Sequence, residues 1–490
     1  MPHDSANHRH YTLLTGATGL LGRYLVKDLL LSGVRLAVIA RNSKRASATQ
    51  RISDICSSWE KELGQQFPRP VTLAGDIRFP DLGLSENDRN WIQSNCNTCI
   101  HNAAILDFRN APRDQEPWVT NLGGTSNLVA FARKHQLDNF HYVSTAYICG
   151  NRTGTILENE LDCGQEFRND YERSKFLAEK HVQEADGFAS KTIYRPAVIT
   201  ADSRTGYTTT YHGLHLYLRL MSMLVPEVEP DENGIRHTKI RLPMTGEERR
   251  NVVTVDWVSR VITELFANRE AHGKTFHLSP ESKLTPRTVI EACCKYFNST
   301  GVEFCGGNNS GVVEQGDFEK SFLPNVGIYN SYDRCDPVFD SQNLQRHASE
   351  IECPRIDETT IHQFLKFGEQ DKWGKRKPQS VPSDFEVANH LKSLRDYALA
   401  YRTNQHNGSQ SELFCLGFDV IGLGGGQWHY DSASDQFKRG LPVKMSAPIV
   451  RITADSLQKI LLGNEANPIL PGAPISESLL SAYVEADSHL

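Results

Sequence analysis

The stretch YTLLTGATGLLGRYLVKDLLLSG, residues 11–33, decides the fold of this chain. Residues 11–14 have strand character, and from Leu20 onward apolar residues recur at helical intervals until Ser32 and Gly33 end the run. Three glycines at three-residue spacing stand between strand and helix: Gly16, Gly19 and Gly22. Glycines let the backbone approach a pyrophosphate, and the helix dipole favours its charge. The stretch therefore predicts a dinucleotide-binding strand–turn–helix unit.

The end of the next strand indicates which dinucleotide binds. The strand VRLAVIAR ends at Arg41, Lys44 and Arg45 follow, and no acidic residue occurs before Asp54. An NAD site places Asp or Glu near this point, roughly 20 residues after the glycines, to hold the ribose hydroxyls. Cations suit a 2'-phosphate instead, so we expect NADPH, bound with the help of Arg41 and Arg45.

Strand and helix patterns alternate beyond this unit. VTLAGDI (residues 71–77) and TCIHNAA (residues 98–104) are expected strands, with a helix near residues 87–94 between them. A long helix is expected in PWVTNLGGTSNLVAFARKH, and FHYVSTAYICG is the next expected strand. This rhythm predicts an α/β fold with a doubly wound parallel sheet of the Rossmann type, whose ligands bind at the carboxyl ends of the strands.

Composition excludes several classes of protein. A chain of 490 residues favours two domains, and a net charge of -6 gives no support for nucleic-acid binding. No apolar run reaches the roughly 18 residues of a membrane span. The polar N-terminus lacks a signal peptide, and the 11 cysteines are scattered, so we expect a cytoplasmic protein with reduced thiols. Cys96 and Cys99 form a lone CxxC without a second pair, and we expect no metal site.

A Tyr and a Lys one helical turn apart form the candidate catalytic pair. Tyr171 and Lys175 lie in NDYERSKFLAEK, and Thr145 stands 26 residues before Tyr171 at the end of the strand HYVSTAY. An isolated pair of this spacing is typical of a solvated helix face. A free phenol has a pKa near 10, however, and a cation one turn away favours the phenolate. Beside a cofactor the spacing predicts an acid–base pair, with the pKa of Tyr171 lowered toward neutrality.

With these motifs in order, the sequence resembles the extended short-chain dehydrogenase/reductase family over about residues 10–365. The resemblance rests on TGATGLLG, GDI, HNAA, TNLGGT, VSTAY, YERSK and YRPAVI. It implies that Tyr171 donates or accepts the proton, that Lys175 binds the cofactor ribose, and that the Thr145 hydroxyl bonds the substrate oxygen. Ser144 is the neighbouring hydroxyl, but its side chain should lie on the other face of the strand. The resemblance also implies a cofactor-binding set: Thr15, Gly16, Thr18, Gly19, Leu20, Leu21, Gly22, Arg41, Arg45, Asp76, Ile77, Asn102, Ala103, Ala104, Asn121, Tyr171, Lys175, Pro196 and Val198.

Segments after residue 195 resemble the thioester-reductase and fatty-acyl-CoA-reductase branch of that family. They are RPAVITADSRTG, LHLYLRLMSMLVP, RRNVVTVDWVSRVITELF and FLPNVGIYNSYDRCDPVFDSQNLQ. The resemblance implies a polar tail at 1–10 and an NADP-binding reductase domain at 11–370, with a substrate lobe contributed mainly by residues 200–250 and 280–345. The apolar helix at residues 214–225 either packs as core or lines a site for an acyl chain.

The implied chemistry is hydride transfer from NADPH to a thioester carbonyl, which releases a thiol and an aldehyde. A second hydride would give an alcohol. No adenylation or carrier domain precedes the reductase motifs, so we expect the thioester to arrive ready-made on CoA or on a separate carrier protein. Two alternatives stay open: an extended-family oxidoreductase acting on a hydroxysteroid, a small ketone or a nucleotide sugar, or a non-catalytic NADP-sensing protein. The presence of Thr145, Tyr171 and Lys175 together argues against the second alternative.

The last quarter of the chain has a different pattern. Charged residues and prolines at 371–383 predict a linker, and residues 384–490 predict a smaller α+β domain. LFCLGFDVIGLGGGQWHYD predicts a hairpin, and PIVRITADSLQKILLG predicts a strand and then a helix capped near Thr453 and ended by Gly463. The region faintly resembles sterol-carrier-protein-2-like domains, which implies an apolar tunnel that could hold an acyl chain. The alternative is a small packing or dimerisation domain, so a homodimer is left open.

Overall fold

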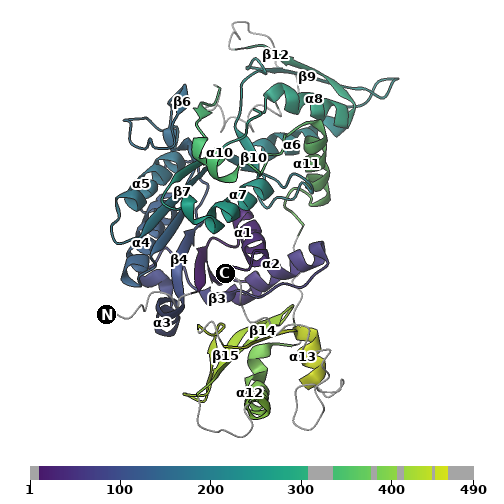
Figure 1. The fold of residues 1–490 in the computed structure, drawn as a ribbon. Helices are drawn as coiled ribbons and strands as arrows, with labels where there is room; N and C mark the ends of the chain where they lie inside the picture. Colours follow the sequence, from purple (N-terminus) through teal and green to yellow (C-terminus); the bar gives the residue numbers. More distant parts are fainter. Residues whose placement is uncertain are drawn as a thin grey trace.

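The computed structural model describes residues 10–306, 320, 335–376, 383, 385–405, 413–443 and 447–461. At its centre lies a seven-stranded sheet of order β11-β7-β5-β4-β1-β2-β3 (Figure 1), in which every neighbouring pair is parallel. The strands are β1 (Tyr11–Thr15), β2 (Arg35–Ala40), β3 (Val71–Ala74), β4 (Cys96–His101), β5 (Asn139–Val143), β7 (Ser190–Pro196) and β11 (Thr275–Leu278). The order reverses between β1 and β4, where doubly wound sheets bind their ligands. The predicted α/β fold is confirmed.

Helices cover both faces of the sheet, and each face buries its own apolar cluster. One face carries α1 (Leu20–Leu31), α2 (Ala48–Leu63) and α7 (Val255–Ala267), and the other carries α3 (Glu86–Asn95), α4 (Thr125–Lys134) and α5 (Asp170–Glu184). The long helix expected before residue 135 is α4 preceded by a π-helical turn, Val119–Gly124. Two buried faces explain why the strands read as nearly continuous apolar runs.

A third apolar cluster forms a lobe above the carboxyl ends of the strands (Figure 1). Its elements are α6 (Leu214–Leu224), β9 (Arg236–Leu242), α8 (Pro286–Phe297), β12 (Ser299–Phe304) and α11 (Glu358–Gln370). Leu218 and Met221 of α6 are buried in this cluster, so much of α6 packs as core. After α6 and β9 of the lobe, β10 (Val252–Thr254) pairs in parallel with β8 (Val198–Thr200), and α7 of the large sheet's cover follows it directly. Most of the FLPNVGIYNSYDRC stretch lies outside the described residues.

Three shorter elements border this lobe and the sheet: β6 (Thr155–Ile156), β13 (Val338–Phe339) and α10 (Gln342–Ala348). Strands β6 and β13 pair in parallel, and α10 contributes Leu344 and Ala348 to the apolar cluster that contains α1 and α7. Within the described ranges, no helix has both the length and the apolar character needed to cross a bilayer.

The C-terminal region forms a four-stranded sheet with helices on it. Its elements are α12 (Leu391–Gln405), β14 (Cys415–Ile421), β15 (Gly426–Asp431), β16 (Gln436–Arg439), β17 (Ile449–Thr453) and α13 (Ala454–Leu461). β14 and β15 pair antiparallel, which confirms the hairpin, and a Cβ added at Gly425 would lie 2.0 Å from the Val420 carbonyl oxygen. The Thr453 hydroxyl accepts a hydrogen bond from the Ser456 amide at 3.0 Å, which confirms the predicted helix start. Gly463 and residues 377–382 of the expected linker lie outside the described residues.

This region packs against the amino-terminal edge of the large sheet. The hydroxyl of Tyr11, the first residue of β1, donates to Gln427 at 2.7 Å and accepts a hydrogen bond from the Leu441 amide at 2.8 Å. Trp91 of α3 donates to the Arg439 carbonyl at 2.7 Å. The cofactor crevice of a doubly wound sheet lies at the opposite, carboxyl edge.

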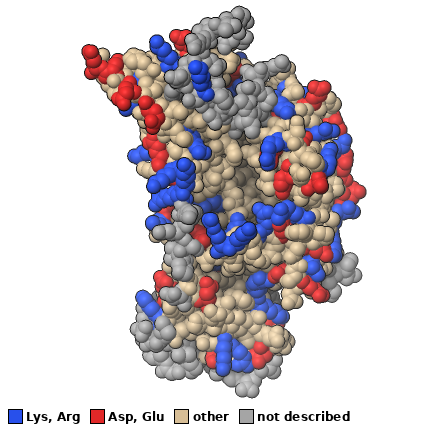
Figure 2. Space-filling model, turned by 180° about the vertical axis from the view of Figure 1, so that it is seen from behind, with Lys and Arg blue, Asp and Glu red and all other residues tan. Residues whose placement is uncertain are grey.

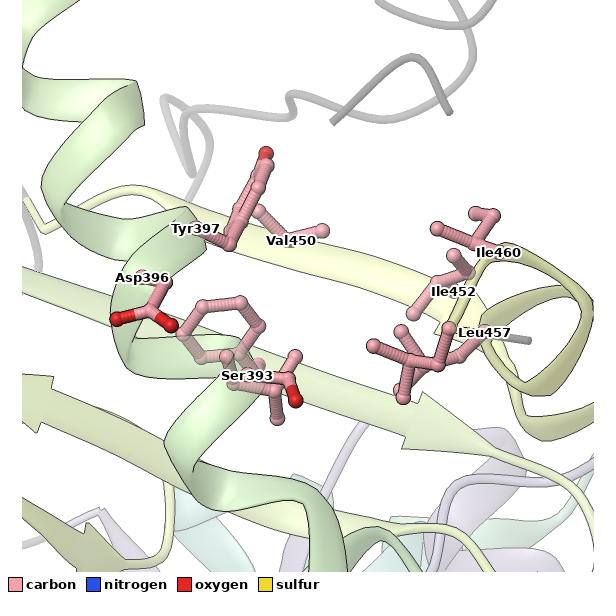
Figure 3. A pocket seen from close by; sticks show the side chains of 10 residues that line it. Ser393, Asp396, Tyr397, Val450, Ile452, Leu457 and Ile460 are labelled. Atoms are coloured by element: carbon pink, nitrogen blue, oxygen red, sulfur yellow. The ribbon is translucent and has the colours of Figure 1, made fainter. Parts of the chain in front are cut away.

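The C-terminal region contains an apolar pocket of about 200 Å³ between α12, β14, β17 and α13 (Figure 3). Tyr397, Val450, Ile452, Leu457 and Ile460 are among its lining residues. The length of the large sheet separates this pocket from the carboxyl ends of the strands. Its position therefore gives no support to the expectation that the region holds the acyl chain of a substrate bound at the crevice.

Candidate active site

The turn after β1 packs closely at Gly16 and Gly22 but leaves Gly19 and the first amides of α1 uncovered. Gly16 has a φ of +75°, and a Cβ there would lie 2.6 Å from the Ala103 amide nitrogen. At Gly22 a Cβ would lie 2.0 Å from the Gly16 carbonyl oxygen, whereas at Gly19 it would meet that oxygen only at 3.4 Å. Gly19 caps α1 without any side-chain hydrogen bond. The first amides of α1, from Leu20 onward, are thus free of a side-chain cap, and the turn fits the pyrophosphate of a dinucleotide.

The end of β4 lies directly against this turn. Asn102 donates to the Gly16 carbonyl at 3.2 Å, and the Ala103 amide donates to the Thr15 hydroxyl at 3.3 Å. Ala104, the next residue, is exposed, as Gly19 is, while Thr18 is half-buried. The structure therefore brings the two predicted motifs TGATGLLG and HNAA together at the point where the strand order reverses.

Three predicted cofactor residues instead turn their side chains into the protein. The Thr15 hydroxyl is buried and bonded to Nδ1 of His101 at 2.8 Å. Asn121 is buried between Ile105 and Ser174, and the Ile77 side chain belongs to the apolar cluster beneath α4. These side chains support the crevice from inside.

Cations gather at the end of β2. Arg41 and Arg45 are exposed, and Arg51 of α2 donates to the Arg41 carbonyl at 2.7 Å. Burial beside Arg41 lowers the pKa of Arg51. The carboxylate of Asp76, which follows β3, is held by Arg78 at 2.6 Å. Arg51 was not predicted: it lies ten residues beyond Arg41, and no motif signals that α2 returns it to the same strand end.

The two predicted hydroxyls meet at the carboxyl edge of the sheet. Tyr171 is the second residue of α5, whose start is capped by Asn169, and Thr145 lies two residues after the end of β5. Burial, with the nearby Glu172, raises the pKa of Tyr171 to about 12, and a hydrogen bond with the Thr145 hydroxyl partly opposes this. Desolvation thus dominates the pKa of Tyr171 in the protein alone, and the lowered pKa expected beside the positively charged nicotinamide stays a prediction.

Lys175 lies deep beneath Tyr171. Its ammonium donates to the Val143 carbonyl at 2.8 Å and lies 4.3 Å from the centre of the Tyr142 ring. Burial lowers the pKa of Lys175 to about 7, although the nearby Glu179 raises it. Lys175 therefore lies at the end of β5, in contact with Val143, two residues before Thr145.

The remaining predicted residues surround this pair. The Thr145 hydroxyl also lies 3.5 Å from the Pro196 carbonyl, and Val198 is exposed two residues later. Ser144 is buried, and its hydroxyl has no hydrogen-bond partner among the described residues. Thr145, rather than Ser144, therefore makes the contact with Tyr171.

Two further residues beside Tyr171 carry no sequence signal. Asp170 accepts hydrogen bonds from the Ala111 amide at 2.8 Å and from Trp118 at 3.3 Å. The ring of Phe108 packs edge-on against the ring of Tyr171, with centroids 5.7 Å apart. Both contacts come from residues 108–118 of the segment between β4 and α4, which lie outside the HNAA and TNLGGT motifs.

The back of the molecule carries a hollow whose rim is rich in Lys and Arg (Figure 2). The rim lies above the C-terminal region in that view. Such a concentration of positive charge favours an anionic ligand such as a nucleotide.

The sequence matches the NAD-binding family described as male sterility protein over residues 14–262, just over half of the chain. A linear gramicidin synthase of Brevibacillus parabrevis is 29% identical over 374 residues, which cover 72% of this chain and 7% of that protein. Fatty acyl-CoA reductase wat of Drosophila melanogaster is 27% identical over 236 residues, covering 41% of this chain and 45% of that protein. The chain thus spans less than half the length of either relative.

Solved structures share the fold of the first three quarters of the chain. The terminal R domain of the myxalamid PKS-NRPS pathway superimposes with a TM-score of 0.59 at 24% identity, covering 75% of this chain and 92% of that domain. The R domain of a nonribosomal peptide synthetase from Mycobacterium tuberculosis has a TM-score of 0.55 at 19% identity, covering 74% and 92%. The chain therefore belongs to the male sterility protein family, within the thioester-reductase branch of the extended short-chain dehydrogenases/reductases, and is an oxidoreductase with a nicotinamide-cofactor site.

Proposed function

We propose that this protein reduces acyl thioesters with NADPH. The observation that carries the proposal is the contact between Tyr171 and Thr145 at the carboxyl edge of the sheet, with Lys175 below and the glycine turn alongside. Two hydroxyls in contact can both bond one carbonyl oxygen, which is the atom that becomes negative when a hydride adds to its carbon.

The cations at the end of β2 support NADPH over NADH. Arg41 and Arg45 follow this strand in sequence and are exposed, and Arg51 contacts the Arg41 carbonyl, where an NAD site would have a carboxylate. The open glycine turn supports binding of the pyrophosphate, and Lys175 lies where it can turn from the Val143 carbonyl toward a ribose hydroxyl. When bound, NADPH supplies the hydride.

The chain's own residues handle the proton. As the carbonyl carbon gains the hydride, Tyr171 gives its phenolic proton to the oxygen while Thr145 donates a hydrogen bond to the same oxygen. The resulting hemithioacetal loses its C–S bond as the hydroxyl proton moves to Tyr171 and the sulfur takes up a proton from water. The products are an aldehyde and a free thiol, and repetition of the hydride step would give an alcohol.

The thiol that leaves is part of CoA or of a carrier protein's prosthetic arm. Similarity to a gramicidin synthase and to a fatty acyl-CoA reductase is compatible with both sources. The ketone, hydroxysteroid and nucleotide-sugar oxidoreductases stay as alternatives, as does a non-catalytic NADP-sensing role.

The test is NADPH oxidation with acyl-CoAs, acyl-carrier-protein thioesters, ketones and nucleotide sugars, with the products identified. We expect aldehyde or alcohol and free thiol from a thioester, and a loss of roughly 10²–10⁴-fold in kcat for Tyr171→Phe with nearly unchanged cofactor affinity. Turnover of a ketone or sugar but of no thioester would contradict the proposal.

A further inference from the structure

Side-chain hydrogen bonds hold the loop between β4 and α4 at two points, Ile105 and Ala111. On one side, Asn121 accepts a hydrogen bond from the Ile105 amide at 2.8 Å and donates to the Ile105 carbonyl at 3.0 Å. On the other side, the Ala111 amide donates to Asp170, the residue before Tyr171, at 2.8 Å. Residues 106–110 are therefore held across the start of α5.

Within this fastened segment, polar and apolar side chains separate. Asp107 and Arg109 pair with each other at 2.6 Å, with the Arg109 side chain almost fully exposed. Phe108 packs edge-on against Tyr171, and Leu106, two residues earlier in the same loop, is 46% exposed. An apolar surface thus adjoins the catalytic phenol, while the charges neutralise one another outside it.

The position of a reacting carbonyl follows from these contacts. Its oxygen must lie about 2.6–3.2 Å from the Tyr171 hydroxyl for proton transfer. The carbons attached to that carbonyl then lie within a few ångströms of the phenol, and the Phe108 ring centre is 5.7 Å from the phenol's centre. The first carbons of the substrate beyond the carbonyl therefore fall within contact range of Phe108. A sugar hydroxyl buried against this ring would find no hydrogen-bond partner there, which disfavours a polar substrate.

We propose that Phe108 and Leu106 form the wall that binds the first methylenes of an unbranched acyl chain, so that Phe108 determines specificity for aliphatic thioesters. This inference rests on the proposed function, because it concerns the substrate of the same site. Each methylene that leaves water against such a wall strengthens binding by about fourfold.

A binding experiment tests the wall without relying on turnover. The probes are S-alkyl-CoA thioethers from two to eight carbons, which cannot be reduced, titrated calorimetrically in the presence of NADP⁺. For the unaltered protein we expect Kd to fall by about two- to fourfold per added methylene over the first carbons. Phe108→Ala should flatten this dependence, and Phe108→Leu should restore most of it.

Leu31→Ala is the matched control for Leu106→Ala. Leu31 is an apolar side chain of similar exposure, 50%, at the end of α1 farthest from the glycine turn. It should leave the dependence on chain length unchanged, whereas Leu106→Ala should weaken it. A chain-length dependence that survives Phe108→Ala would overturn the inference, as would an equal loss for all lengths, which indicates a structural role.

The same variants assayed with acyl-CoAs and acyl-carrier-protein thioesters separate the two proposals. If thioesters are not reduced but thioether binding depends on Phe108, the wall is supported and the proposed function fails. If thioesters are reduced and neither binding nor kcat/KM depends on Phe108 in a length-dependent way, the proposed function is supported and the wall is refuted.

Discussion

Arg41 and Arg51 come from different elements and contact each other at the end of β2. We expect both to contribute to the selectivity for NADPH over NADH. A charge-assisted hydrogen bond to a phosphate contributes about 1.5–3 kcal/mol, which corresponds to roughly 10- to 150-fold in affinity. We therefore expect Arg41→Ala and Arg51→Ala each to weaken NADPH by that factor while leaving NADH almost unchanged, as measured by fluorescence titration.

Arg51 also supports the main chain at Arg41, since it donates to the Arg41 carbonyl. Arg51→Lys, which keeps the charge, should recover part of the NADPH affinity. Lys61→Ala, in the last turn of α2, is the control and should change neither cofactor's affinity. Equal losses of NADPH and NADH would refute the assignment of these cations to the 2'-phosphate.

Lys175 links the pH to the stability of the fold. Its pKa is lowered by burial from 10.5 to about 7, while in the unfolded chain it keeps its ordinary value. Between about pH 7 and 10.5 the unfolded state therefore binds more protons at Lys175 than the folded state does. In this range the contribution of Lys175 to the unfolding free energy increases as the pH rises. Below pH 7 the cost of burying the charge is fully present and amounts to a few kcal/mol.

Lys175→Met removes that cost. Without added cofactor, we expect this variant to have a higher unfolding free energy than the unaltered protein at pH 6, and the difference to shrink as the pH approaches 10. Denaturant unfolding at intervals of one pH unit measures it. A difference that does not vary with pH would mean that Lys175 stays charged in the folded protein.

At the scale of elements, α5 carries both Tyr171 and Lys175, so its position on the sheet determines the geometry of the site. Its residue Glu179, one turn after Lys175, pairs with Arg195 of β7 at 2.6 Å, and the two side chains are 0% and 1% exposed. Arg195 also donates to the Glu158 carbonyl at 3.2 Å. This buried pair fixes α5 against the sheet and so positions Tyr171 and Lys175.

Removing one partner of a buried ion pair costs more than removing an exposed one. Glu179→Gln leaves Arg195 buried and unpaired, so we expect the unfolding free energy to fall by about 3–5 kcal/mol. The pair Lys180–Asp162 has the same 2.6 Å distance, but its side chains are 37% and 51% exposed. Asp162→Asn should therefore leave the unfolding free energy almost unchanged. Similar losses for both variants would show that burial of the pair is not what matters.

The elements that carry motifs were predictable, because glycine spacing and apolar periodicity are local properties. The turn after β1 and the start of α5 were located correctly for this reason. The directions of single side chains were not predictable: Thr15 faces His101, and Asn121 fastens the loop at Ile105. A motif gives a position in the chain, whereas the neighbours packed against that position decide where its side chain points.

At the scale of the whole molecule, the position of the C-terminal region could not be predicted. Its contacts with the large sheet join residues far apart in sequence, such as Tyr11 and Gln427, which are 416 residues apart. The residues that make these contacts are single polar side chains, which show no periodicity in the sequence. Gly440 is a second example, because a Cβ there would lie only 3.0 Å from the Trp91 ring. The hairpin itself followed from its glycines, because a turn is specified by adjacent residues.

From its contacts with the amino-terminal edge of the large sheet, we predict that the C-terminal region stabilises the fold. Selection among acyl chain lengths is then expected at the carboxyl edge of the sheet. Tyr11→Phe removes a hydroxyl and leaves the Gln427 oxygen and the Leu441 amide without their buried partner. An unsatisfied buried polar group costs about 1–3 kcal/mol, so we expect the unfolding free energy to fall by about that amount. Truncation before residue 385 should lower stability further, since it uncovers Tyr11 and Trp91.

The kinetic outcome separates support of the fold from capture of the substrate. For Tyr11→Phe we expect unchanged kcat/KM ratios between short and long acyl thioesters, because its contacts lie at the edge opposite Tyr171. Tyr296→Phe is the control: its hydroxyl donates to Glu369 at an exposed site, so the unfolding free energy should change by less than about 1 kcal/mol. If the C-terminal pocket held the acyl chain during reduction, loosening the region would raise KM progressively with chain length. A selective rise for long chains in Tyr11→Phe would therefore contradict the role in stability alone.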